Sequence, residues 1–134
     1  MTWCHGAPGI ALARLMTLQR LDDPGIRADA EIALDTTVRA GFGMNHSLCH
    51  GDLGNLEPVL IASQVLGDAR WQSHTAAISS GVLQRIKSGC VCGVPQGVET
   101  PGLLVGLAGI GYGLLRLADP SRIPSVLALA PPTK

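Results

Sequence analysis

Residues 49–55 read Cys-His-Gly-Asp-Leu-Gly-Asn, and two further stretches of the chain repeat the pattern of this segment. Residues 4–10 read Cys-His-Gly-Ala-Pro-Gly-Ile, and residues 104–110 read Leu-Val-Gly-Leu-Ala-Gly-Ile. Each stretch places Gly-x-x-Gly near the start of an apolar segment, and the stretches lie 45 residues (4 to 49) and 55 residues (49 to 104) apart. Spacings of this size are typical of repeats built from two helices. The sequence therefore predicts a repetitive helical fold.

The segments around these stretches are of two kinds. Residues 8–21, 52–66 and 101–118 are apolar around most of a helical circumference, which predicts three buried inner helices. Residues 24–40 and 68–87 are amphipathic, which predicts two outer helices that each bury one face. Inner helices that alternate with outer helices describe an α/α toroid, and three inner helices are too few to close a ring. We therefore expect an all-α chain that forms a partial α/α toroid.

Residues at the ends of these segments support the helix boundaries. Asp23 followed by Pro24 is typical of an N-cap with proline at the first helical position, and Asp68 is the expected N-cap of the second outer helix. Glycines stand where helices should end, at Gly41, Gly43, Gly67 and Gly89.

The exposed face of the first outer helix carries charges four residues apart. Such neighbours on a helix surface attract each other when their charges are opposite. We therefore expect two ion pairs on this face, Arg27 with Glu31 and Asp35 with Arg39.

Composition and charge narrow the class of protein. Hydrophobic residues make up 46% of the 134 residues and aromatic residues only 3%, which favours closely packed helices rich in Leu, Ile, Val and Ala. Ten basic and ten acidic residues cancel, and no basic cluster marks a nucleic-acid surface. The chain opens without a charged leader and apolar stretch, and its most apolar run, residues 101–115, is shorter than the roughly 20 residues that span a bilayer. We expect a cytoplasmic protein with no membrane span and no nucleic-acid partner.

Three potential metal ligands occupy equivalent places in two of the repeated stretches: Cys4, Cys49 and His50. Two thiolates and one imidazole leave a tetrahedral zinc ion with one open position, which is typical of a catalytic site. Equivalent turns of neighbouring inner helices converge at the mouth of a toroid, so residues 45 apart in sequence can share one ion. The alternative is that these cysteines are small buried hydrophobic residues.

At these residues the chain resembles the lanthionine synthetase C-like family. The matching segments read Trp-Cys-His-Gly-Ala-Pro-Gly at 3–9, Cys-His-Gly-Asp-Leu-Gly-Asn at 49–55 and Gly-Leu-Ala-Gly-Ile-Gly at 106–111. The resemblance runs nearly from end to end, and it is strongest to the C-terminal cyclase domain of the bifunctional, class II lanthipeptide synthetases. Residues 1–134 are accordingly expected to be the C-terminal part of a cyclase domain.

The resemblance implies both a cofactor and a reaction. The cofactor is zinc (Zn2+) held by Cys4, Cys49 and His50. The reaction is the cyclisation of a ribosomally made precursor peptide, in which a free cysteine thiol adds to dehydrated serine or threonine and forms a (methyl)lanthionine thioether. A bound metal lowers the pKa of the thiol, and a general acid must supply a proton to the acceptor carbon. We name His5, next to Cys4, as the candidate for this proton transfer or for a substrate contact.

The chain also departs from the family pattern. Family members carry a catalytic histidine and aspartate upstream of the first cysteine ligand, and class II enzymes carry a dehydratase domain as well. This chain begins three residues before Cys4. We therefore expect a missing upstream portion as a partner and little cyclase activity from the chain alone. Two alternatives stay open: a non-catalytic module that binds zinc and a thiol or peptide, and a purely structural remnant.

The remaining candidate residues receive simpler interpretations. His46 and His74 are expected at the surface, and Asp52 is expected to cap a helix. Cys90 and Cys92 are separated by one residue, which suits a shared metal poorly and favours structural or free thiols. Residues 123–129 are expected to form a short extended stretch.

Overall fold

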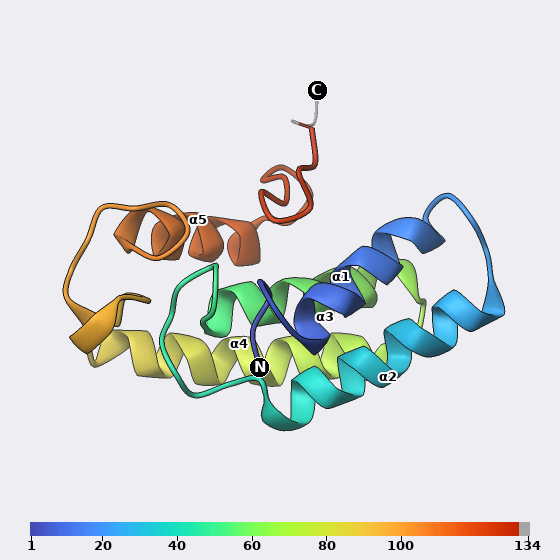
Figure 1. The fold of residues 1–134 in the computed structure, drawn as a ribbon, viewed down its shortest axis with the longest axis horizontal. Coiled ribbons are helices and arrows are strands. Elements are labelled where there is room, and N and C mark those ends of the chain that lie inside the picture. Colours follow the sequence, from blue (N-terminus) through green and yellow to red (C-terminus); the bar gives the residue numbers. More distant parts are fainter. Residues whose placement is uncertain (132–134) are drawn as a thin grey trace.

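Residues 1–131 are described by the computed structural model, and this part of the chain is helical (Figure 1). It contains five α-helices and one short 3-10 helix: α1 (Ala7–Leu18), α2 (Pro24–Ala40), α3 (Asp52–Val65), α4 (Ala69–Lys87), η1 (Pro95–Gly97) and α5 (Leu107–Ala118). Extended pairing in residues 1–131 is limited to an isolated bridge between Thr2 and His5. The predicted all-α class is confirmed. The expected extended stretch at 123–129 is wrong, because residues 126–129 form turns.

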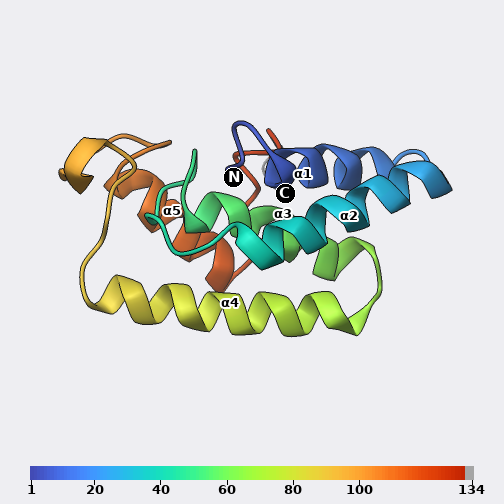
Figure 2. The same cartoon turned by 60° about the horizontal axis from the view of Figure 1, so that its bottom comes forward.

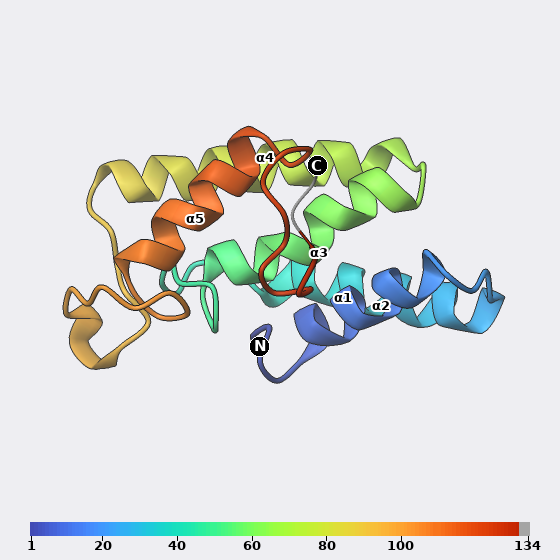
Figure 3. The same cartoon turned by 90° about the horizontal axis from the view of Figure 1, so that it is seen from above.

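The helices alternate between an inner and an outer row. The inner helix α3 packs against both α1 and α5, while α2 packs on α1 and α4 packs on α3. Figure 2 shows α4 running along one side of the molecule beneath α3 and α5, and Figure 3 shows the chain after α5 returning across the arc. The three inner helices therefore form an open arc, as expected for part of an α/α toroid.

Helix α3 is the centre of the core. Every residue from 52 to 62 is buried, whereas α1 and α5 at the two ends of the arc expose apolar side chains such as Ile10 and Leu115. The prediction that each outer helix buries one face is also confirmed, since Leu34 of α2 and Trp71 and Val82 of α4 are fully buried. A helix with neighbours on all sides is largely apolar. The buried polar side chains of this segment have partners elsewhere in the fold: Asp52 pairs with Arg85, Asn55 donates to Gly41, and Glu57 pairs with Arg116.

The capping residues of the outer helices behave as predicted. The Asp23 carboxylate accepts a hydrogen bond from the N–H of Ile26 at 2.9 Å, and the Asp68 carboxylate accepts one from Arg70 at 2.9 Å. Gly67 and Gly89 follow the ends of α3 and α4 with φ of 69° and 132°, which glycine adopts without strain. Only α5 begins well away from its predicted position, because residues 101–106 form the turn that precedes it.

Ion pairs on the outer helices are set by tertiary contacts. The side chains of Glu31 and Asp35 on α2 face Arg70 of α4, at 3.6 Å and 3.7 Å, and Arg27 lies 3.3 Å from Asp22. The predicted pairing of these charges along α2 is therefore wrong. A guanidinium from the neighbouring helix reaches both carboxylates of α2 at once.

Within residues 1–131, none of the helices is both long enough and apolar enough to cross a bilayer.

Candidate metal centre

The three repeated stretches fold into similar turns in front of an inner helix, with φ of 146° at Gly6 and of −124° and −123° at Gly51 and Gly106. In each copy the first glycine is the N-cap, at Gly6, Gly51 and Gly106. The second glycine packs against the carbonyl oxygen six residues earlier, so that an added Cβ would come closer than 3.0 Å, a distance that real Cβ atoms essentially never show. These pairs are Gly9 with Trp3, Gly54 with Leu48 and Gly109 with Leu103. Glycine is needed here because the backbone of the turn lies directly against the helix.

Backbone hydrogen bonds join the equivalent residues of successive turns. The N–H of Cys4 donates to the carbonyl oxygen of Cys49 at 3.3 Å, and the N–H of Cys49 donates to that of Leu104 at 2.8 Å. The amide of Asn55 adds a side-chain link, since its Nδ2 donates to the carbonyl oxygens of Met1 (3.1 Å) and Gly41 (2.6 Å). The turns therefore lie side by side, and each carries its side chains next to those of its neighbour.

This arrangement brings Cys4, Cys49 and His50 together. One potential ligand atom from each of the three lies within 4.8 Å of the others. Cys4 is exposed, while Cys49 and His50 are half-buried, so the cluster is open on the Cys4 side. A tetrahedral zinc ion holds sulfur ligands at about 2.3 Å and nitrogen ligands at about 2.0 Å, so its ligand atoms lie within about 4 Å of one another. The three atoms are already within 4.8 Å, and small side-chain movements would bring them to this spacing.

The electrostatics of the cluster also fit a cation. Burial raises the pKa of the Cys49 thiol, and the hydrogen bond to the Cys4 side chain and the charge of that neighbour raise it further. A divalent cation between the two sulfurs reverses this effect, because it stabilises both thiolates at once. The soft sulfur donors and the single imidazole suit zinc better than calcium or magnesium, which prefer oxygen.

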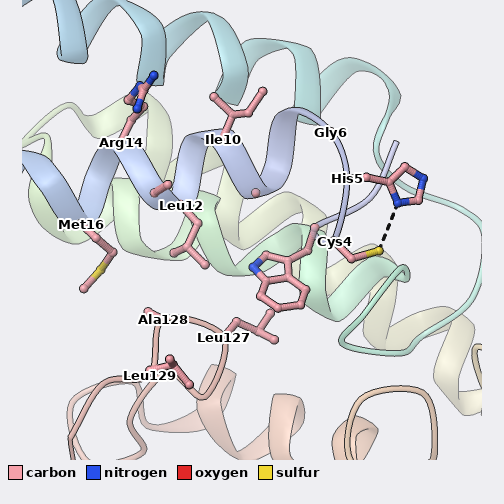
Figure 4. A pocket seen from close by; sticks show the side chains of 13 residues that line it. Cys4, His5, Gly6, Ile10, Leu12, Arg14, Met16, Leu127, Ala128 and Leu129 are labelled. Atoms are coloured by element: carbon pink, nitrogen blue, oxygen red, sulfur yellow. Dashed lines mark hydrogen bonds between the residues drawn. The ribbon is translucent and has the colours of Figure 1, made fainter.

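The residues around Cys4 add two polar groups at the open side. The Cys4 sulfur lies 3.3 Å from Nδ1 of His5 and 3.5 Å from the hydroxyl of Thr2, and these two groups are 3.3 Å apart. Figure 4 shows the His5 ring beside the sulfur, pointing away from α1. The structure thus places the candidate His5 next to a potential metal ligand. Thr2 was not singled out by the sequence, in which a lone threonine before Trp-Cys carries no signal.

A cavity of about 730 Å³ opens beside this cluster. It lies between α1 and the turn at residues 127–129, and apolar side chains including Trp3, Leu12 and Leu127 line most of it (Figure 4). Cys4 and His5 belong to its wall. A molecule bound at the cysteine therefore has an apolar surface within reach.

Segment 90–93 covers the turn that carries Cys49 and His50. The N–H of His46 donates to the carbonyl oxygen of Val91, and the N–H of Val91 donates to Nδ1 of His46, both at 2.9 Å. A Cβ at Gly93 would lie 2.9 Å from Nε2 of His50, so this glycine allows the segment to approach the imidazole. The sequence carries little signal for the role of Gly93, which is marked only by its place after Cys92.

Several simpler interpretations need correction. His46 is 4% exposed and not at the surface, because segment 90–93 folds over it from 45 residues away. His74 is half-buried and packs against Trp71 with ring centroids 5.7 Å apart. Asp52 is buried and begins α3, whereas Gly51 is the N-cap. The expectation for Cys90 and Cys92 is confirmed, since both are free thiols and of the two only Cys92 is buried.

Known proteins similar to this chain were found in two comparisons. Residues 1–128 match the family model described as lanthionine synthetase C-like protein. The lacticin 481/lactococcin biosynthesis protein LcnDR2 of Lactococcus lactis subsp. lactis is 30% identical, over 85% of this chain and 14% of that protein. Glutathione S-transferase LANCL1 of Danio rerio is 28% identical, over 90% of this chain and 29% of that protein. The chain therefore spans less than a third of either relative.

Proposed function

The chain belongs to the lanthionine synthetase C-like family, and from this membership we propose that residues 1–134 are the C-terminal part of a zinc-dependent lanthionine cyclase domain. The proposed substrate is a dehydrated, ribosomally made precursor peptide that retains free cysteines. The observation that carries the proposal is the convergence of Cys4, Cys49 and His50 from two repeats within 4.8 Å. The proposed location is the cytoplasm.

Cys4, Cys49 and His50 are the proposed zinc ligands. Three protein ligands leave the fourth position of a tetrahedral ion for the substrate thiol. When bound there, zinc supplies a positive charge that lowers the pKa of this thiol. The exposure of Cys4 and the cavity beside it leave a route by which a peptide reaches the cluster.

The proposed reaction is an addition in which no atoms are lost. The S–H bond of the cysteine breaks, a C–S bond forms at Cβ of dehydroalanine or dehydrobutyrine, and the neighbouring Cα gains a proton. A side chain that holds or passes a proton near the sulfur serves this step. His5, with Nδ1 3.3 Å from the Cys4 sulfur, is our proposal for that group or for a substrate contact.

The apolar cavity is the proposed contact surface for the peptide around its reacting cysteine. Its walls of Trp3, Leu12 and Leu127 bury apolar side chains, and burial of apolar area is worth about 25 cal/mol per Å². Because such contacts are not directional, they accept several peptide sequences in turn.

Incubation with a dehydrated, cysteine-containing precursor peptide tests the proposal. Ring formation leaves the peptide mass unchanged but protects the thiol from alkylation, so the expected result is fewer alkylated products after incubation with the zinc-loaded chain. The chain is tested alone and together with the upstream half of a related cyclase. Cys49→Ala serves as the control that retains the fold and loses a ligand. Unchanged alkylation in both settings would contradict the proposed activity.

A second candidate is a module that binds zinc and a thiol without forming rings. The relative from Danio rerio is named as a glutathione S-transferase, which favours a site for a thiol peptide as small as glutathione. Zinc-dependent binding of glutathione or of a cysteine peptide, measured by calorimetry and without ring formation, would favour this candidate. If the chain binds no zinc when stoichiometric zinc is added, both candidates fail and a purely structural role is left.

A further inference from the structure

The residue that follows the ligand turn is a buried carboxylate. Asp52 is 1% exposed, and its two oxygens have different partners: Oδ1 accepts the N–H of Gly43 at 2.8 Å, and Oδ2 pairs with Nη2 of Arg85 at 2.5 Å. Its own N–H donates to the carbonyl oxygen of Asn45 at 2.7 Å. Asp52 therefore closes the segment 43–52 into a loop and ties this loop to α4. Cys49 and His50 lie inside the loop.

The other two copies of the turn show that this carboxylate is not required for the backbone. Ala7 and Leu107 occupy the positions that correspond to Asp52. The same helix-starting hydrogen bond nevertheless forms in all three copies, with N–H to carbonyl oxygen distances of 3.2, 3.0 and 3.1 Å. The repeated turn and the start of its helix thus need no acid at this position. Asp52 is confined to the copy that carries two potential ligands.

Stability alone gives little reason for a buried carboxylate at this place. Removing a carboxylate from water costs several kcal/mol, and the partner Arg85 keeps 44% of its side chain exposed, where an ion pair gains little. The other two copies use an apolar residue at this position. The pair between Asp52 and Arg85 instead fixes geometry, because its charge-assisted hydrogen bond holds the loop in one orientation.

The far end of the same loop is tied to the chain that follows α4. His46 and Val91 exchange two hydrogen bonds of 2.9 Å, and Asn45 uses its side-chain oxygen to accept the N–H of Ser47 at 3.0 Å. The loop is thus held at both ends by α4 and its continuation. Asp52 with Arg85 forms the charged attachment, and His46 with Val91 forms the neutral one.

We propose that Asp52 is a positioning residue for the metal ligands, in which its carboxylate, held between Gly43 and Arg85, orients the loop so that Cys49 and His50 face Cys4. This inference rests on the proposed function, because it assumes that these three residues hold a metal. Asp52 acts through the backbone of the loop and does not touch the metal or the substrate.

Zinc affinity of the 134-residue chain tests the inference, by competition with a chromophoric chelator, for the wild type, Asp52→Asn and Arg85→Gln. Loss of groups that orient metal ligands typically weakens binding about 10- to 100-fold, and we expect at least a 10-fold loss in both variants. In the variant that combines Asp52→Asn and Arg85→Gln, the fold-loss of zinc affinity should be far smaller than the product of the two single-variant losses. Arg85→Lys, which keeps the positive charge, should retain most of the wild-type zinc affinity. Cobalt substitution should give altered absorption bands in the two weakened variants.

Arg70→Gln is the matched control on the same helix. Arg70 pairs with Glu31, Asp35 and Asp68 on the outer surface, away from the loop. We expect its substitution to leave the zinc affinity and the cobalt spectrum unchanged. A similar loss of affinity in this variant would mean that any weakening of α4 is sufficient, and the positioning role would be wrong.

Two outcomes separate this inference from the proposed function. If the wild type binds no zinc, the proposed function and this inference fail together. If the wild type binds zinc and both variants bind it equally tightly with an unchanged cobalt spectrum, only the positioning role fails, even when their melting temperatures are lower. Should Asp52→Asn not fold, Arg85→Gln decides, because the Arg85 side chain is 44% exposed and its removal leaves no cavity inside the core.

Discussion

The second and third copies of the repeated turn have similar backbone conformations but carry side chains of different chemistry. In both, a glycine of the inner helix packs against a carbonyl oxygen six residues earlier, Gly54 on Leu48 and Gly109 on Leu103. Before the first glycine, the second copy carries Cys49 and His50, and the third carries Leu104 and Val105. The turn is therefore a scaffold that positions whichever side chains precede it. The proposed metal site lies where two neighbouring copies both present donor atoms.

The two copies also differ in how their loops are held. The second is buried under segment 90–93 and tied to α4 through Asp52 and Arg85. The third lies at the end of the arc, where Leu104 is 44% exposed and Leu107 is 38% exposed. Of these two copies, the one that carries the potential ligands is thus the more buried.

The largest expected effect is the loss of the metal from the second copy. Cys49→Ala removes one of three proposed ligands, and we expect stoichiometric zinc binding to disappear while helix content by circular dichroism stays the same. Leu104→Ala at the corresponding position of the third copy should retain one zinc per chain. Metal analysis after gel filtration checks both variants. A Cys49→Ala protein that keeps its zinc would show that the ligand assignment is wrong.

The next largest effect concerns the scaffold that the two copies share. A Cβ at Gly54 or Gly109 clashes with backbone that cannot move aside, so alanine at either position should lower the free energy of unfolding by about 3 kcal/mol or more. Gly111→Ala is the control, because its added Cβ meets nothing within 4 Å and alanine favours a helix by about 1 kcal/mol. Urea titrations provide the measurement. Equal stability of all three variants would rule out a shared steric constraint.

A smaller effect is expected from segment 90–93, which lies over the second copy and also donates the N–H of Gly93 to the carbonyl oxygen of Val105 in the third copy at 2.7 Å. Gly93→Ala places a methyl group against His50 and Ser47, and we expect a roughly 10-fold loss of zinc affinity. Gly102→Ala in the third copy has 3.7 Å of space to its nearest neighbour and should leave the affinity unchanged. Chelator competition compares the two. If both variants bind zinc like the wild type, the approach of Gly93 to the imidazole is not needed for binding.

The smallest expected effect is a pH dependence of the folding stability, which arises from a histidine of the second copy. Burial lowers the pKa of His46 below its ordinary value of 6.5; the charge of Arg85 lowers it further, and that of Asp52 opposes the shift. Below pH 6.5 the unfolded chain therefore binds a proton that the folded chain resists, so stability falls as the pH falls. The corresponding position of the third copy is Pro101, which does not titrate.

His46→Gln should flatten this part of the pH dependence. The melting temperature of the metal-free chain is followed between pH 7.5 and pH 5, where we expect a shallower decline in the variant than in the wild type. An identical decline in both proteins would place the acid sensitivity elsewhere.

Much of the fold was predictable because its signals are local. The bounds of α2 follow from Asp23, Pro24 and Gly41, which act within a few residues of themselves. The equivalence of Cys4 and Cys49 was visible because the repeat places each before a Gly-x-x-Gly. The late start of α5 was not predicted, since residues 101–106 are as apolar as the helix. Two local hydrogen bonds, from Gly106 to Gly102 and from Leu107 to Thr100, and one from Cys49 to Leu104 hold them as a turn.

The sequence by itself determined the helices, their inner and outer faces, and the pairing of the first two turns as potential ligand carriers. Periodicity and glycine spacing encode these features, because they depend on the backbone within one repeat. Only the tertiary structure decided that His46 is buried, that Arg70 serves two carboxylates of α2 and that Asp52 meets Arg85. Burial and charge pairing depend on segments that are distant in sequence, and the free energy of a polar group is set by whichever segment covers it.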